Sequence, residues 1–223
     1  MGRKTLNQQS QLLNDIHHFS VNYDTREIFF HSSTLSDEDV GIDFRVSTGF
    51  IKNIRFLNSI NQNPILIHMN SDGGCSSHGL AIYDAIKSSK AHITIICSGM
   101  VASMATVILQ SADTRILHPN CTFLVHHGWI SMPDMHQIAA KSALEHSEQF
   151  IEKMLDIYSE RCVDGEIFVK NKMKKDAVKA YINTKMKDKH DWYLTAKDAV
   201  QYGFVDGILG DDKFTSIETL RDV

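Results

Sequence analysis

A long apolar run whose composition changes halfway constrains the fold of this chain more than any other feature. Residues 92–97 are rich in β-branched side chains, which favour a strand, and Ser98-Gly99 is a turn signal. Residues 103–109 are Ser, Met, Ala, Thr, Val, Ile and Leu, which predicts a buried helix that starts near Ser103. A buried strand that leads into a buried helix is the basic unit of an α/β protein.

The segments on both sides of this run continue the alternation. Apolar spacing predicts strands at 26–31, 64–70, 92–97, 115–117 and 122–126, and helices at 44–60, 78–87, 103–109, 135–161 and 196–202. Elements in this order form β-α-β units, so we expect an α/β fold with a mainly parallel sheet flanked by helices. Residues 1–24 are polar and rich in Gln and Asn, and we expect a mobile or partner-ordered arm there. Residues 25–223 are then long enough for a single domain.

Composition and charge argue against several classes of protein. A formal net charge of −4 gives no reason to expect nucleic acid or an anionic membrane as a partner. No apolar run has the length of a membrane span, and the N-terminal residues lack the apolar core of a signal peptide. The four cysteines form no C-x-x-C pair, so we expect a reducing, cytoplasmic location. Eight lysines within 170–189 are interpreted as a solvated helical face in preference to a nucleic-acid patch.

Ser103 stands where the predicted strand and turn lead into the predicted helix. The unpaired N–H groups and the positive dipole end of a helix start lie beside a residue in this position. Such an environment suits a nucleophile whose reaction creates an oxyanion. The alternative is that Ser103 is a simple N-cap, since serine is a favoured capping residue.

A serine nucleophile needs a base, a group that orients the base, and donors for the oxyanion. His126, at the C-terminal end of a predicted strand, is the preferred base among twelve histidines, with His127 as its rival. Asp191 is the candidate third member because it precedes an aromatic pair, residues 192 and 193, that would anchor its loop. Gly73-Gly74 lets backbone N–H groups approach a ligand, and the N–H of Met104 directly follows the serine.

Taken together and in this order, these motifs resemble one family, the proteolytic subunit of the Clp protease (ClpP). The resemblance covers roughly residues 26–209, and its most specific parts are Ala102-Ser103-Met104 and Tyr202-Gly203-Phe204-Val205-Asp206. The other segments that carry it are Asn70-Ser71-Asp72-Gly73-Gly74, 79–86, 95–101, Leu117-His118-Pro119-Asn120, Asp191 and 199–201.

The resemblance implies a fold and an assembly. The implied fold is a ClpP/crotonase-like spiral of β-α-β units with a protruding handle helix, here at about 133–161, and an insertion follows at about 162–189. The family implies a homo-oligomer of two stacked seven-membered rings, a tetradecamer, that encloses a chamber. An AAA+ unfoldase normally feeds polypeptide into that chamber. No metal or small cofactor is implied.

The resemblance also implies the chemistry. It makes Ser103 the nucleophile, His126 the general base and acid, and Asp191 the residue that orients the histidine. The expected function is a serine endopeptidase that degrades or processes unfolded polypeptides. Hydrolysis would proceed through an acyl-enzyme that water then attacks.

The remaining site residues have implied roles in binding. Gly74 and Met104 supply the two N–H groups of the oxyanion hole. Gly73, Cys75 and Ser76 bind substrate, and Cys75 and Ser76 lie in a strand that pairs with the substrate backbone.

The sequence departs from the family pattern in several places. Asp72 replaces a usual Pro, His127-Gly128 replaces Gln-Pro, and Ala105 replaces Gly. Sixty-five positions separate His126 from Asp191, more than the family normally has. Three alternatives therefore stay open: a crotonase-type acyl-CoA enzyme, an inactive or regulatory ring subunit, and a viral or otherwise specialised member that processes its own assembly proteins.

Overall fold

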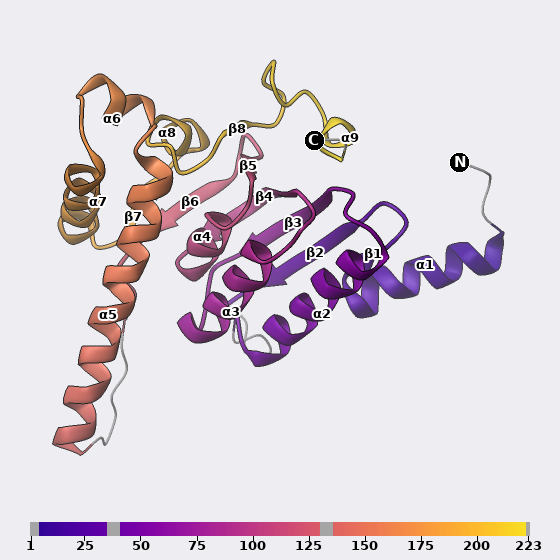
Figure 1. The fold of residues 1–223 in the computed structure, drawn as a ribbon, viewed down its shortest axis with the longest axis horizontal. Helices are drawn as coiled ribbons and strands as arrows, with labels where there is room; N and C mark the ends of the chain where they lie inside the picture. Colours follow the sequence, from indigo (N-terminus) through magenta and orange to yellow (C-terminus); the bar gives the residue numbers. More distant parts are fainter. Residues whose placement is uncertain (1–4, 35–40, 130–135, 222–223) are drawn as a thin grey trace.

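The computed structural model describes residues 5–34, 41–129 and 136–221, which form one mixed sheet with helices around it (Figure 1). The strand order is β1-β2-β3-β4-β5-β8, while β6 pairs with β4 and β7 pairs with β6. Pairing is parallel except for β1 with β2 and β6 with β7, so the mainly parallel α/β sheet is confirmed. The strands are β1 Val21–Asn22, β2 Glu27–Ser32, β3 Ile65–Ser71, β4 Ile93–Ala102, β5 Thr114–Leu117, β6 Thr122–Val125, β7 Trp192–Leu194 and β8 Gly207–Ile208.

Strand β4 pairs with two different neighbours along its length. Residues 94–97 are in register with β5, and residues 100–102 are in register with β6. The strand bends between these parts, where Gly99 has φ 63° and the N–H of residue 100 donates to Asn70 Oδ1 at 3.2 Å. The turn predicted at Ser98-Gly99 is therefore wrong. These residues stay within one bent strand, because glycine accepts a left-handed φ without leaving the sheet.

Side chains alternate between the two faces of the sheet, and different segments cover each face. On one face Leu66 packs with Phe214 and Leu220 of the C-terminal segment, which includes α9 (Ile217–Leu220). On the other face Ile65 and the other odd-numbered apolar residues of β3 join the main core. Three helices cover that face (Figure 1): α2 Phe44–Ile60, α3 Ser76–Lys87 and α4 Met104–Leu109.

The longest helix, α5 (Gln137–Cys162), leaves the body of the molecule along its first half (Figure 1). At a rise of about 1.5 Å per residue, its 26 residues span about 39 Å. Full burial begins only at Met154, whereas Ile138 and Leu144 on the projecting half are 75% and 46% exposed. This helix is the protruding handle that the sequence predicts. Of the predicted range 133–161, residues 133–135 lie outside the described residues.

The lysine-rich segment after α5 folds into two helices, α6 (Glu166–Lys170) and α7 (Lys175–Lys189), and α7 runs beside α5 (Figure 1). Lys179 of α7 forms ion pairs with Glu152 and with Asp156 of α5, the latter at 2.6 Å. One stripe of α7 is buried, at Val178, Ile182 and Met186. Most lysines of the segment are exposed, as expected for a solvated helical face. The chain then returns to the sheet through β7, α8 (Ala196–Gln201) and β8.

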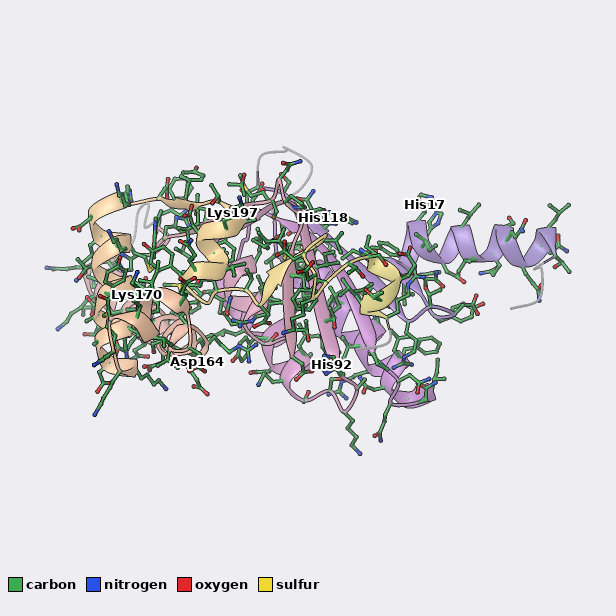
Figure 2. The ribbon with its side chains drawn as sticks, turned by 90° about the horizontal axis from the view of Figure 1, so that it is seen from above. His17, His92, His118, Asp164, Lys170 and Lys197 are labelled. Carbon is green, nitrogen blue, oxygen red and sulfur yellow. The ribbon has the colours of Figure 1, made fainter. Side chains whose placement is uncertain are left out.

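Part of the predicted N-terminal arm is a helix that the sequence analysis does not predict, α1 (Leu6–Phe19). Thr5 and Gln8 form a capping box at its start, and none of its residues is buried. Seen from above, α1 with His17 lies at one end of the molecule, opposite the end that carries Lys170 (Figure 2). Across the described ranges, no helix combines the length and the hydropathy of a membrane-spanning segment.

Glu27 of β2 anchors the C-terminal segment to the sheet. Its side chain is 5% exposed and accepts hydrogen bonds from Arg221 Nη2 at 2.8 Å, His68 Nε2 at 3.2 Å and Thr25 Oγ1 at 2.5 Å. Burial alone would raise the pKa of Glu27. Hydrogen bonds from His68, Thr25 and Arg221, together with the charge of Arg221, outweigh burial and lower this pKa from 4.5 to about 2.

This shift predicts an acid-sensitive contribution to stability. Because the pKa of Glu27 is lower in the folded state, its contribution is present above the ordinary value and is lost as the pH falls from 4.5 to about 2. We expect the free energy of unfolding, measured by urea titration, to fall less steeply over this interval in Glu27→Gln than in the wild type. Glu148→Gln, an exposed change on α5, is the control. Equal slopes in all three proteins would contradict the assignment.

Candidate active site

Three neighbouring strands end at the same place, and each contributes one residue there. Ser103 follows the last residue of β4, His126 follows the last residue of β6, and Asp191 precedes the first residue of β7. The pairing registers align the end of β6 with the end of β4 on one side and with the start of β7 on the other. The structure therefore brings together three predicted residues that lie far apart in the sequence.

His126 bridges the other two side chains. Its Nε2 lies 2.8 Å from Ser103 Oγ, and its Nδ1 lies 3.1 Å from Asp191 Oδ1. With the proton on Nδ1, the imidazole donates to the carboxylate and accepts from the serine hydroxyl, which is the arrangement of a Ser-His-Asp triad. The His126 side chain is 17% exposed and that of Asp191 is 50% exposed, so solvent reaches the carboxylate end of the triad.

Ser103 has a backbone conformation that few non-glycine residues adopt, with φ 54° and ψ −127°. Such a conformation costs on the order of 1–3 kcal/mol and persists only where surrounding contacts hold it. Here the Ser103 N–H donates to the Leu124 carbonyl at 3.0 Å. Ser103 is the N-cap of α4 by position, but its side chain makes no capping hydrogen bond. The simple N-cap interpretation is therefore wrong, and the hydroxyl bonds to His126 instead.

Two buried hydroxyl groups connect α5 to the strained backbone of Ser103. Thr106 Oγ1 donates to the Ser103 carbonyl at 2.6 Å, and the Tyr158 hydroxyl lies 2.6 Å from Thr106 Oγ1. Since Thr106 uses its only proton on Ser103, Tyr158 is the donor of the second bond. Tyr158 is 1% exposed, and burial raises the pKa of its hydroxyl well above the usual range. The sequence indicates Tyr158 only as an apolar position of a helix, and it gives no signal for Thr106.

Two backbone N–H groups beside Ser103 have no hydrogen-bond partner within the described residues. Met104 is the first residue of α4, so its N–H has no intrahelical acceptor. Gly73 donates its N–H to Ser71 Oγ at 3.1 Å, whereas the N–H of Gly74 is unpaired. A Cβ on Gly73 would lie 2.9 Å from Met104 N and 2.7 Å from Ser103 Cβ. Glycine is therefore required for this close approach.

Cys75 and Ser76 do not form the strand that the resemblance implies. Cys75 is the N-cap of α3 and Ser76 is its first residue, so the chain turns into a helix directly after Gly74. The Cys75 N–H donates to the Ile42 carbonyl at 2.9 Å, and the Ile42 N–H donates to the Gly73 carbonyl at 2.8 Å. These two bonds form a short parallel bridge opposite Gly74. The N–H and C=O groups of Gly74 itself therefore point to the other side.

Strand β7, which Asp191 precedes, is held by a cluster of aromatic rings. Trp192 is 6% exposed, and its ring centroid lies 4.9 Å from that of Tyr202 and 6.0 Å from that of Phe204. Tyr193 is 60% exposed. The predicted aromatic anchor is right for Trp192 and wrong for Tyr193, because neighbouring side chains of a strand point to opposite faces.

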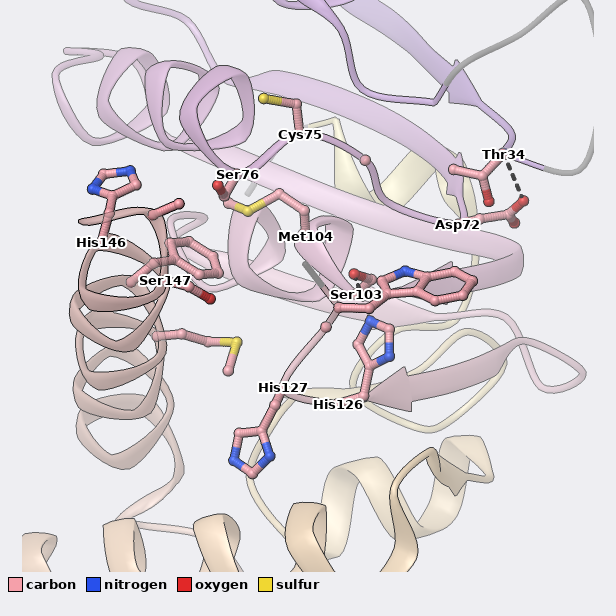
Figure 3. Close-up of a pocket in the computed structure, with 16 residues that line it drawn as sticks. Thr34, Asp72, Cys75, Ser76, Ser103, Met104, His126, His127, His146 and Ser147 are labelled. Atoms are coloured by element: carbon pink, nitrogen blue, oxygen red, sulfur yellow. Dashed lines mark hydrogen bonds between the residues drawn. The ribbon is translucent and has the colours of Figure 1, made fainter. Parts of the chain in front are cut away.

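A cleft of about 590 Å³ opens beside Ser103 (Figure 3). Thr34 and Asp72 line one end of the cleft, and Phe150 and Met154 of α5 form another part of its wall. The cleft walls also include Gly74, Cys75, Ser76, Met104, His126, His127 and His146. The site thus combines a hydrogen-bonded hydroxyl with room for a ligand of peptide size.

Other candidate groups of the chain are less suited to this chemistry. His127, the rival base, points away from Ser103 (Figure 3). Its Nε2 lies 2.9 Å from Asn183 Oδ1 of α7. Burial raises the pKa of the Cys121 thiol to about 12 and raises that of Cys97 as well, so these thiols are poor nucleophiles. Within the described ranges, no group of three or more His, Cys, Asp or Glu side chains is arranged to hold a metal ion.

Known proteins resemble this chain over most of its length. The family model for Clp protease matches residues 17–212. The ATP-dependent Clp protease proteolytic subunit of Chlorella vulgaris is 30% identical over 182 residues, which cover 78% of this chain and 81% of the relative. The subunit of the same description from Streptococcus mutans is 29% identical over 177 residues, with coverage of 75% and 80%.

Among solved structures, a ClpP1 variant from Listeria monocytogenes has a TM-score of 0.67 and 21% identity, and covers 87% of this chain and 96% of that one. This likeness concerns the fold, and it confirms the expected ClpP-like architecture with its handle helix. The family model spans far more than half of the sequence, and the relatives agree with it along most of their own length. This chain therefore belongs to the Clp protease family.

Proposed function

We propose that this chain is a serine endopeptidase that cleaves unfolded or flexible polypeptides inside a chamber built from copies of itself. Family and fold make it a Clp-type protease subunit. The observation that most supports catalytic activity is the continuous hydrogen-bonded chain from Ser103 through His126 to Asp191. It lies beside the unpaired N–H groups of Gly74 and Met104, which are the donors that an oxyanion needs.

The proposed reaction has two stages. Ser103 Oγ attacks the peptide carbonyl carbon while His126 Nε2 takes its proton, and the N–H groups of Gly74 and Met104 donate to the oxyanion. His126 then gives the proton to the leaving amine, which frees the first product and leaves an acyl-enzyme. In the second stage, water loses a proton to His126 and attacks the acyl carbonyl carbon. The ester bond to Ser103 Oγ then breaks, His126 returns the proton to this oxygen, and the second product leaves with a new carboxyl group. Asp191 keeps the imidazole in the required tautomer throughout.

Substrate binding in this proposal relies on backbone pairing. Gly74 directs its N–H and C=O groups away from the bridge to Ile42, so an extended peptide can pair with it as an added strand. Gly73 keeps this edge close to Met104, because a side chain there would intervene. Cys75 and Ser76 contribute as walls of the cleft.

The proposed assembly is the tetradecamer of two rings that the family implies, with an AAA+ unfoldase as a partner. The projecting half of α5 carries Ile138 and Leu144 exposed to solvent, which favours its burial between subunits. The four cysteines are unpaired, which supports the expected cytoplasmic setting.

Substitution of the triad tests the proposed chemistry. We expect Ser103→Ala and His126→Ala to lower kcat for a fluorogenic peptide by about 10⁶-fold, since either change removes the nucleophile or its base. We expect Asp191→Asn to lower it by about 10⁴-fold, because the imidazole loses its orienting acceptor. Ser98→Ala, at an exposed serine of β4, is the matched control. A fluorophosphonate that still labels the Ser103→Ala protein would rule out Ser103 as the nucleophile.

A single methyl group tests the oxyanion donors. In Gly73→Ala the new Cβ would meet Met104 N at 2.9 Å, so we expect kcat to fall by about 10²–10³-fold, the usual effect of losing one such donor. Gly49→Ala on α2 is the control, since its Cβ would have no neighbour within 4 Å. Full activity of Gly73→Ala, measured with the same peptide, would place the oxyanion elsewhere.

Native mass spectrometry tests the assembly. We expect a tetradecamer for the wild type and smaller species for Ile138→Asp, because a charge would be buried where the projecting helices meet. Val169→Asp, at an equally apolar exposed position of α6, should leave the assembly intact. A wild-type chain that stays monomeric at micromolar concentration would contradict the proposed chamber.

A further inference from the structure

We propose that Asn183 of α7 is a positioning residue for the catalytic histidine. Its side-chain oxygen holds His127, and this contact fixes the chain segment from which His126 reaches Ser103. The inference rests on the proposed function, and it gives the segment at 162–189 a role within the active site.

The segment after β6 has few other supports. Residues 127–129 form no backbone hydrogen bond with any other part of the chain that the structure describes. Gly128 has φ 78° and open space around its Cα, and Trp129 is 96% exposed. The bond from His127 Nε2 to Asn183 Oδ1, at 2.9 Å and partly buried, is therefore the main restraint on the residues after His126.

Asn183 is itself presented by a well-held helix. One side of α7 is buried at 178, 182 and 186, and Lys179 holds the helix to α5 through two carboxylates. The Tyr181 ring packs on Phe168 with 5.4 Å between centroids, in the aromatic cluster that also contains Trp192. An acceptor on such a helix has little freedom to move away from its donor.

The same helix also leads directly to the third member of the triad. Helix α7 ends at Lys189, and His190 caps it with φ 62° and an N–H that donates to the Met186 carbonyl at 3.0 Å. Asp191 is the next residue, and its carboxylate bonds to His126. One helix therefore restrains both the carboxylate and the neighbour of the imidazole. Movement of α7 would alter the 3.1 Å contact between Asp191 Oδ1 and His126 Nδ1.

Two substitutions of Asn183 distinguish a role in positioning His126 from a contribution to overall stability. Asn183→Leu keeps the size of the side chain and removes the acceptor, whereas Asn183→Asp keeps an acceptor oxygen. We expect Asn183→Leu to lower kcat for a fluorogenic peptide by about 10–100-fold with KM nearly unchanged, because the imidazole is misplaced but the cleft is intact. We expect Asn183→Asp to retain most of the activity.

Thr184→Ala is the matched control, since Thr184 is the exposed neighbour of Asn183 on the same helix. Its kcat and melting temperature should equal those of the wild type. A fall in melting temperature without a change in kcat for Asn183→Leu would assign the bond a purely structural role and would overturn the inference. Equal losses of kcat in Asn183→Leu and Asn183→Asp would overturn it as well.

Main-chain displacement gives a readout that does not depend on activity. We expect the crystallographic B-factors of residues 127–129, normalised to those of β6, to be higher in Asn183→Leu than in the wild type and unchanged in Thr184→Ala. If the wild type neither cleaves peptides nor reacts with a fluorophosphonate, the proposed function fails, while higher B-factors would still support the restraint. If the wild type is active and the normalised B-factors of 127–129 are the same in Asn183→Leu, the inference fails and the function stands.

Discussion

The pairing of strand β6 with two different partners is the constraint on which the site depends. Its parallel partner β4 ends beside Ser103, and its antiparallel partner β7 begins beside Asp191. Backbone hydrogen bonds thus bring the three side chains to one end of the sheet, where His126 lies within hydrogen-bonding distance of both neighbours. Such preorganisation removes much of the entropy loss that free side chains would incur in a reaction.

Supports from outside the sheet complete this arrangement. The strained backbone of Ser103 is held by Leu124 on one side and by Thr106 on the other, and Tyr158 of α5 fixes Thr106. Helix α7, which leads to Asp191, is held to α5 by the ion pairs of Lys179. The projecting helix α5 therefore also contacts the elements that hold Ser103 and Asp191.

Features set by local sequence pattern could be predicted from the sequence, whereas features set by tertiary contacts could not. Buried strands and helices have strong periodicity, so most elements of the sheet were predictable, and the triad candidates lie at predicted strand ends. The bend at Gly99 was not predictable, because the pairing of residues 100–102 with β6 keeps this turn-forming residue within a strand. Helix α1 was missed because it buries no apolar face. The supports from Tyr158 and Asn183 depend on residues 52 and 56 positions from their partners, which no local pattern reveals.

A structure of the protein after reaction with a peptide boronate tests the central claim most directly. We predict a tetrahedral boron bonded to Ser103 Oγ, with one boronate oxygen accepting hydrogen bonds from the N–H groups of Gly74 and Met104. His126 should still lie between the adduct and Asp191. Boron bonded to any other side chain, or an imidazole turned away from Asp191 in the assembled particle, would contradict the account.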